Sequence, residues 1–325
     1  MTKVSVVLPS YNHASCLPKA IDSVFAQTFQ DWELLIVDDG SEDGSVSIIE
    51  AYVAKYPQRI RFFQHENRKN KGLAATYRLA FEKCRGEYVA LLESDDYWRE
   101  DSLALKAKVL EDHPDVAVVY TDVEMFGDPG LIRKVQNTVK AWDLPYNELS
   151  QGPFSGFHFL MDENLVLTCS AFITRKELLV DLNFDAPYDA WFDRWILIQL
   201  SMRGCFLWIP QAATFWQVRG TSYLHQFNRQ LRLYRESCAF ELSLLSLVSD
   251  LLGSGLGEET LTVGLTEEIQ KRKCTWRVRL LERIFNSSFL QRWPWGLDQA
   301  LLCHHLLVCV AVLPQKLLKG TAKAG

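Results

Sequence analysis

The sequence predicts an α/β protein with a doubly wound, mainly parallel sheet. Short apolar runs typical of strands alternate four times with segments of helical apolar spacing, all within about the first 95 residues. Polar and acidic clusters stand directly after three of these runs, where ligands bind in such sheets. Turn-forming residues such as Pro9 and Gly40 separate the segments.

The predicted elements follow in order along the chain. Strands are expected at residues 3–9, 33–37, 60–64, 88–92, 116–120 and 170–173. Helices are expected at residues 17–25, 45–53, 74–84 and 191–202. A stretch rich in Gly, Pro, Asn and Gln at residues 126–165 has weak periodicity, which predicts a long loop region.

The pattern divides the chain into an α/β domain at residues 1–225 and a helical C-terminal region at 226–325, with helices expected at 231–252 and 261–284. A basic stretch from Lys271 to Arg283 and an apolar segment from Leu301 to Leu313 have three interpretations. They could pack on the first domain, form a homodimer interface, or rest on an anionic membrane surface as a peripheral contact. We favour packing.

Composition limits the function classes. The chain has 325 residues, 48% of them hydrophobic, and a formal net charge of −5. This mild acidity argues against nucleic acid as a partner. The eight cysteines include no CxxC pair, there is no signal-peptide pattern, and no apolar run reaches the length of about 18 residues that spanning requires. We therefore expect a cytoplasmic protein, with a peripheral position at the inner face of the membrane as the alternative.

The acidic cluster Glu93-Ser94-Asp95-Asp96 directly follows the predicted strand at 88–92. Three carboxylates at one strand end repel one another unless a cation lies among them, and hard cations such as Mg²⁺ or Mn²⁺ prefer oxygen ligands. The alternative is a solvated acidic turn that caps the next helix. The position after a central strand favours the metal site.

Two further clusters stand at strand ends. In Asp38-Asp39-Gly40-Ser41 a carboxylate could accept hydrogen bonds from a base or from ribose hydroxyls, although an ordinary turn uses the same residue types. In Pro9-Ser10-Tyr11-Asn12, Tyr11 could stack on a base and Pro9 could stiffen the turn.

These motifs together resemble family 2 glycosyltransferases of the GT-A fold. The resemblance rests on residues 4–12, 27–41 and 86–96, is dense from residue 3 to about 105, and thins to scattered matches by about 222. It implies that Tyr11 and Asp39 contact the base with Asp38 close by. It also implies that Asp95 and Asp96 meet the ribose and a Mn²⁺ or Mg²⁺ ion. Glu93 stands where the family usually has Asp, and we keep it as a secondary metal ligand.

The resemblance also assigns cationic and catalytic groups. Lys71, in the segment before the third helix, would neutralise phosphate, with Arg68 and Lys69 as rivals. Asp193 matches the catalytic base at the start of a helix that ends in Gly204, with Phe192 in place of the usual Glu. Asp189 is the competing base, and an N-terminal helix cap is the alternative role for Asp193.

Arg219 occupies a position where the family often has a His that holds metal or diphosphate. An arginine cannot ligate a cation, but its planar fork suits phosphate oxygens. We therefore expect Arg219 to contact the leaving diphosphate. His225 is a rival, and a surface arginine near a strand end is the alternative.

The function implied is a hexosyltransferase type of enzyme that inverts the anomeric centre. It would move a sugar from a nucleoside diphosphate sugar, expected to be UDP-linked, to a saccharide or lipid-linked acceptor hydroxyl in bacterial-type polysaccharide or glycoconjugate synthesis. Two alternatives stay open: a nucleotidyltransferase, which would favour a glycine-rich loop after the first strand, and a non-catalytic nucleotide-sugar-binding or scaffold protein.

Overall fold

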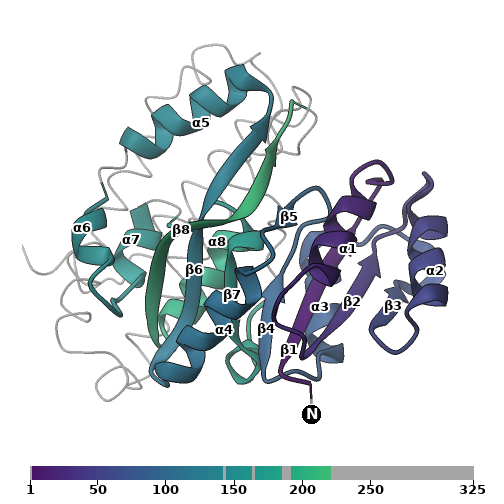
Figure 1. Cartoon of the computed structure of the whole chain (residues 1–325), viewed down its shortest axis with the longest axis horizontal. Coiled ribbons are helices and arrows are strands. Elements are labelled where there is room, and N and C mark those ends of the chain that lie inside the picture. The colour runs from purple at the N-terminus through teal and green to yellow at the C-terminus, as the bar shows by residue number, and fades with distance from the viewer. Residues whose placement is uncertain (1, 142–143, 163–164, 185–191, 221–325) are drawn as a thin grey trace, which may run out of the picture. The chain divides into compact units, whose positions relative to one another are not determined.

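The computed structural model describes residues 2–141, 144–162, 165–184 and 192–220. They contain an eight-stranded sheet with the order β3-β2-β1-β4-β7-β6-β8-β5 (Figure 1). The predicted boundary at 225/226, the predicted C-terminal helices, the basic and apolar segments between 271 and 313, and the rivals Asp189 and His225 lie outside these residues.

The N-terminal half of the sheet is parallel, as predicted. Strands β1 (Val4–Ser10), β2 (Trp32–Asp38), β3 (Ile60–Gln64) and β4 (Tyr88–Leu91) pair in parallel. Helices α1 (Leu17–Phe25), α2 (Ser45–Lys55) and α3 (Leu73–Lys83) connect them. Every residue of β1, β2 and β4 is buried, as expected for parallel strands covered on both faces.

The second half of the sheet is mixed. Strand β7 (Phe172–Arg175) runs antiparallel to both β4 and β6 (Val116–Gly127), so β4 and β6 point the same way. Strand β8 (Cys205–Val218) is parallel to β6, and the short β5 (Tyr97–Trp98) pairs antiparallel with β8. The carboxyl ends of β1, β2, β4, β6 and β8 therefore lie at the same edge of the sheet.

The prediction of a long loop at residues 126–165 is wrong. This stretch holds the end of β6 and three helices, α5 (Pro129–Ala141), α6 (Tyr146–Leu149) and α7 (Phe157–Asp162). The Asp128 carboxylate accepts hydrogen bonds from the backbone N–H groups of Gly130 and Leu131 at 2.8 and 3.0 Å, and Pro129 is the first helical residue. An Asp-Pro pair of this kind starts a helix, so the Pro and Gly content that suggested a loop marks a helix start.

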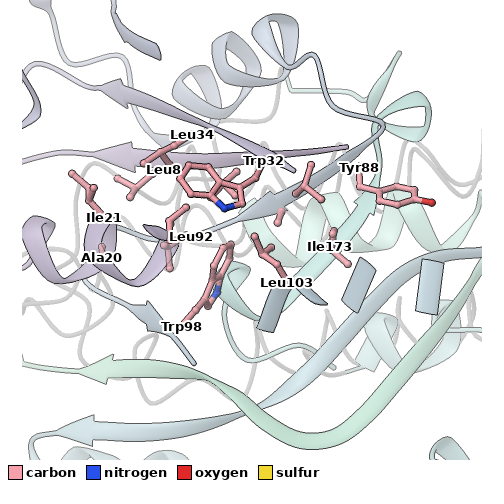
Figure 2. Close-up of a cluster of buried hydrophobic side chains, with 14 of the residues drawn as sticks. Leu8, Ala20, Ile21, Trp32, Leu34, Tyr88, Leu92, Trp98, Leu103 and Ile173 are labelled. Atoms are coloured by element: carbon pink, nitrogen blue, oxygen red, sulfur yellow. The ribbon is translucent and has the colours of Figure 1, made fainter. Parts of the chain in front are cut away.

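A buried apolar cluster fixes the strands that carry the polar turns (Figure 2). Leu8 and Leu34 come from β1 and β2, Ile21 from α1, and Leu103 from α4 (Ser102–Asp112). Trp98 is anchored at the same place, because its indole N–H donates to the Ser170 carbonyl at 2.7 Å. The predicted helix at 191–202 is α8 (Phe192–Ser201), also almost wholly buried.

Among the residues that the structure describes, no helix is both long and apolar enough to span a bilayer.

Candidate active site

The turns that follow β1, β2 and β4 meet at one edge of the sheet. The Asn12 backbone N–H donates to Ser41 Oγ at 2.9 Å, and Asn12 Oδ1 accepts from the Glu42 N–H at 2.8 Å. His13 Nδ1 lies 2.7 Å from Ser94 Oγ in the acidic turn. The three motifs found separately in the sequence therefore form one continuous surface.

Tyr11 is available at this surface. Its side chain is 44% exposed at the end of β1, where an aromatic face can stack on a base. Pro9 is buried and stands two residues after Val7, the last residue of β1 that pairs with β4. Because proline lacks an N–H, it cannot extend the hydrogen bonding to β4, and its fixed φ stiffens the approach to Tyr11.

Asp38 shapes the turn after β2. One carboxylate oxygen accepts from the N–H groups of Gly40 and Ser41 at 3.2 and 2.9 Å, and the other accepts from the Ser41 hydroxyl at 2.5 Å. The residue is fully buried. Its hydrogen bonds order the turn that presents its neighbour Asp39.

Asp39 joins this turn to the loop before α3. Its two carboxylate oxygens accept from the backbone N–H groups of Lys71 and Gly72 at 2.6 and 3.0 Å. Gly40 permits the close approach, since its φ is +79° and a Cβ there would lie 2.6 Å from the Arg68 carbonyl oxygen. The exposed Lys71 side chain is thereby held at the edge of the site.

Asp96 is a structural clamp. Its carboxylate accepts three hydrogen bonds: from the Gln217 backbone N–H at 2.9 Å, Thr168 Oγ1 at 3.0 Å and Ser170 Oγ at 2.6 Å. Burial, with a smaller contribution from the neighbouring Asp95, raises the pKa of Asp96 to about 7, although these three donors oppose the shift. Asp96 thus ties the acidic turn to β8 and to the segment before β7.

Glu93 points toward α3. Its carboxylate accepts a hydrogen bond from the Tyr77 hydroxyl, and its backbone N–H donates to Ser170 Oγ at 2.9 Å. Burial raises the pKa of Glu93 to about 8; the Tyr77 hydrogen bond opposes this shift, while nearby acids, including Asp193, add to it. The ionised form of Glu93 is therefore disfavoured, and a cation held beside it would favour that form.

Asp95 and Arg219 form an ion pair across the site. Arg219 Nη2 lies 2.8 Å from Asp95 Oδ2, and both side chains are mostly buried. The same nitrogen lies 2.5 Å from His13 Nε2. A guanidinium only donates, so His13 Nε2 accepts, and its Nδ1 carries the proton that is donated to Ser94 Oγ. Burial lowers the pKa of His13, which suits this neutral form.

Sequence reasoning missed His13 as a site residue. It follows Tyr11 and Asn12 directly, but its partner Arg219 stands at the far end of the α/β domain. The position of His13 directly after a strand-end motif was the signal in the sequence that could have identified it.

Asp193 lies in the first turn of α8, where its Oδ1 accepts from the Arg194 backbone N–H at 2.7 Å. The ring of Phe192 stacks on Tyr77, with centroids 4.7 Å apart and planes 9° from parallel. Because Tyr77 also donates to Glu93, the start of α8 is fixed against the acidic turn. The residue that replaces the usual Glu thus has a packing role.

The described residues contain no preformed metal cage, meaning no group of three or more His, Cys, Asp and Glu side chains arranged to hold an ion. Mg²⁺ commonly takes only one or two protein carboxylates and completes its shell with water and substrate phosphates. Asp95 and Glu93 suit that mode, whereas the oxygens of Asp96 are engaged by its three donors.

Solved structures share this fold. The chain is similar to S. aureus TarS residues 1–349 in complex with UDP, with a TM-score of 0.64 and 18% identity over 97% of this chain and 82% of that one. It is also similar to the mannosyltransferase PcManGT from Pyrobaculum calidifontis in complex with GDP-Man and Mn²⁺. That match has a TM-score of 0.56 and 16% identity, and it covers 97% of this chain and 82% of that one. These likenesses confirm the predicted GT-A type of α/β fold.

Sequence relatives match the N-terminal part. The putative glycosyltransferase EpsE of Bacillus subtilis is 35% identical over 129 residues, 40% of this chain and 46% of that protein. The putative teichuronic acid biosynthesis glycosyltransferase TuaG, also of Bacillus subtilis, is 41% identical over 100 residues, 31% of this chain and 38% of that protein. Each match thus spans less than half of the relative's length.

The family itself is shown by a broader match. The sequence model described as "Glycosyl transferase family 2" covers residues 5–182, from β1 to beyond β7. Because this is more than half of the chain, the protein belongs to glycosyl transferase family 2.

Proposed function

We propose that the protein is a glycosyltransferase that moves a sugar from a UDP-sugar to an acceptor hydroxyl in bacterial polysaccharide or glycoconjugate synthesis. The observation that carries the proposal is the meeting of Arg219 and Asp95 at the sheet edge where the turns of Tyr11 and Asp39 also lie. The similar TarS structure is in complex with UDP, and TuaG is named for teichuronic acid biosynthesis.

The donor would lie along this edge. The exposed ring of Tyr11 stacks on the base, and the Asp39 carboxylate, which the loop before α3 holds in place, lies beside it. Asp38 contributes by ordering the turn. The diphosphate lies toward Lys71 and Arg219, where two cationic side chains offset its charge.

A divalent cation, Mn²⁺ or Mg²⁺, is part of the proposal. Asp95 and Glu93 would hold it together with the donor phosphates, and Asp96 would hold the turn in shape. The bound cation would stabilise the negative charge of the departing diphosphate. The similar PcManGT structure is in complex with Mn²⁺.

The reaction is a single displacement with inversion. Asp193 accepts the proton of the acceptor hydroxyl as the acceptor oxygen forms a bond to the anomeric carbon, and the bond from that carbon to the phosphate oxygen breaks. Arg219 and Lys71 stabilise the UDP that leaves. The N-terminal position of Asp193 on α8 keeps the carboxylate fixed while this proton moves.

Turnover with a panel of nucleoside diphosphate sugars tests the proposal. We expect at least one UDP-sugar to release UDP with Mn²⁺ present, with faster release when acceptor saccharides are added. Binding of every donor without turnover would instead identify a non-catalytic binding protein. Release of pyrophosphate from a nucleoside triphosphate and a sugar phosphate would identify a nucleotidyltransferase.

A further inference from the structure

Helix α5 carries a basic face that the donor site described above does not use. The helix holds Arg133, Lys134 and Lys140 and no acidic residue, although the whole chain has a net charge of −5. All three cations are exposed, and none of them forms an ion pair within the part of the chain that the structure describes. Asp128, directly before the helix, is engaged in capping it. The helix therefore presents unpaired positive charge to solvent.

The apolar face of the same helix is directed to the protein. Its four apolar side chains recur at helical spacing and are half-buried, whereas the residues between them are exposed: Leu131, Ile132, Val135 and Val139. The helix contacts β6 (Figure 1), and Leu131 Cδ1 lies 3.9 Å from the position that a Cβ on Gly220 would take. A helix that lies in a membrane surface buries its apolar face in lipid instead. The face that α5 offers to a partner is therefore the basic one.

The spacing of the cations fits a chain of charges. Arg133 and Lys140 are two helical turns apart on one stripe of the helix, so about 10 Å separates them along the axis at a rise of about 1.5 Å per residue. An open recess on this helix is lined by Gly130, Arg133, Lys134, Asn137 and Thr138. Cations, an amide and a hydroxyl together suit the oxygens of anionic groups. A single small anion would meet one or two of these groups, whereas a polymer with repeated charges can meet all of them.

The start of α5 is fixed beside the donor site. The Asp128 N–H donates to the Val218 carbonyl at 2.8 Å. Gly127 has a φ of +115°, and a Cβ there would lie 2.2 Å from the same carbonyl oxygen, so glycine is required for this close approach. Val218 is followed directly by Arg219, which pairs with Asp95. A chain that lies along α5 therefore has one end next to the segment that carries Arg219.

We propose that the basic face of α5 binds a polyanionic acceptor, a saccharide chain whose units carry carboxylate or phosphate groups, and holds its growing end beside the donor. The planar fork of Arg133 engages one oxyanion at two points, and Lys134 and Lys140 meet neighbouring charges as compact cations. This inference rests on the proposed glycosyltransferase function, whose acceptor class it names.

Oligosaccharides of equal length and different charge test the surface. The probes are a galacturonic acid hexamer, a maltohexaose phosphorylated at its primary hydroxyls, and unmodified maltohexaose. Isothermal titration measures their binding to the full-length protein with UDP present, at low and at high ionic strength. We expect at least one charged hexamer to bind at least about tenfold more tightly than maltohexaose, and salt to remove this preference by screening exposed charges. The charged hexamer that binds more tightly identifies the anionic group.

Removal of charge from α5 locates the effect. A variant with Arg133→Gln, Lys134→Gln and Lys140→Gln should bind the charged hexamer about tenfold more weakly, because exposed ion pairs are individually weak but three act together here. Its melting temperature should stay that of wild type, since glutamine is a good helix former at exposed positions. The matched control should bind as wild type does. It removes the same charge from exposed lysines on three other helices by Lys55→Gln, Lys83→Gln and Lys108→Gln.

Equal binding of charged and neutral hexamers, or equal loss in the α5 variant and the control, would overturn the surface. Binding of phosphatidylglycerol vesicles that needs the three α5 cations, without binding of either charged hexamer, would overturn it in favour of a membrane contact.

Release of UDP from a panel of donor sugars by the wild-type protein is measured in parallel. If a donor is turned over while neither charged hexamer binds, the inference about α5 is wrong and the transferase function stands. If a charged hexamer binds through α5 but no donor is turned over, the transferase function fails, and with it the acceptor role of the surface.

Discussion

Arg219, at the end of β8, donates a hydrogen bond to His13, just beyond β1, with 2.5 Å between Nη2 and Nε2. The same guanidinium reaches Asp95, so one side chain connects the ends of β1, β4 and β8. The contact with His13 depends on a neutral imidazole whose proton lies on Nδ1, facing Ser94. His13 thereby fixes the orientation of the cation that we expect to meet the diphosphate.

Replacing His13 tests this positioning role. His13→Leu removes the acceptor, and we expect UDP to bind about fivefold more weakly, the equivalent of one net hydrogen bond of about 1 kcal/mol. His13→Gln places an amide oxygen nearby and should recover most of the affinity. Isothermal titration of UDP measures both. Equal loss in the two variants would contradict the role of His13 as a hydrogen-bond acceptor for Arg219.

Asp95 and Asp96 should separate in their effects on stability. Asp96→Asn turns one acceptor of the three-donor clamp into a donor, so we expect the free energy of unfolding to fall by about 1 to 3 kcal/mol. Asp95→Asn removes the charge of one ion pair but leaves an oxygen that can still accept from Arg219, so we expect a loss of no more than about 1 kcal/mol. Urea denaturation of both variants measures the difference. Equal destabilisation would contradict the clamp.

Asp193→Asn separates a base from a structural role at the start of α8. The variant keeps the size of the side chain, and the loss of one charge in the first turn of a helix costs only about 0.3 to 1 kcal/mol, so it should fold normally and bind UDP as wild type does. As a general base, however, it should lose about 100- to 10,000-fold in transfer rate. The comparison of single-turnover rate and melting temperature decides the role. A variant that keeps full turnover would leave Asp193 with only a structural role in the first turn of α8.

Lys106 on α4 should make stability depend on pH. Its side chain is fully buried, Nζ has no hydrogen-bond partner within the described part of the chain, and burial lowers its pKa to about 7. Since a lysine in the unfolded chain has a pKa of about 10.4, the unfolded state binds more protons between pH 7 and 10. The free energy of unfolding should therefore rise with pH across that window.

Lys106→Met tests this relationship. The variant should be more stable than wild type by roughly 4 kcal/mol at pH 7, and the difference should shrink toward pH 10. Urea denaturation at several pH values measures it. Lys108→Met, whose side chain is 74% exposed, is the control and should behave as wild type. A gap between Lys106→Met and wild type that stays constant with pH would be inconsistent with a neutral buried lysine.

The sequence was informative where local pattern decides structure. The runs that form β1 to β4 are apolar throughout and end at polar turns, so their order, and the convergence of Tyr11, Asp39 and Asp95, follow from parallel topology. Helix α5 was missed because Pro129 and Gly130 were counted as loop formers, although Asp128 caps the helix they begin.

Long-range partners could not be predicted in this way. Asp95 and Asp96 are adjacent and chemically identical, yet Asp96 is engaged by Thr168, Ser170 and Gln217, which stand 72 to 121 residues further along the chain. Only the fold shows that one carboxylate is a clamp and the other faces Arg219. The role of His13 likewise depends on a partner 206 residues away.

The most direct test of the account is whether UDP binds where Asp95 and Arg219 meet. Isothermal titration of UDP with Mn²⁺ should give one site in wild type and binding at least about tenfold weaker in both Asp95→Asn and Arg219→Ala, a difference of about 1.4 kcal/mol or more. Arg78→Ala, at an exposed position of α3, is the control and should bind as wild type does. UDP binding of wild-type strength in both site variants would contradict the account.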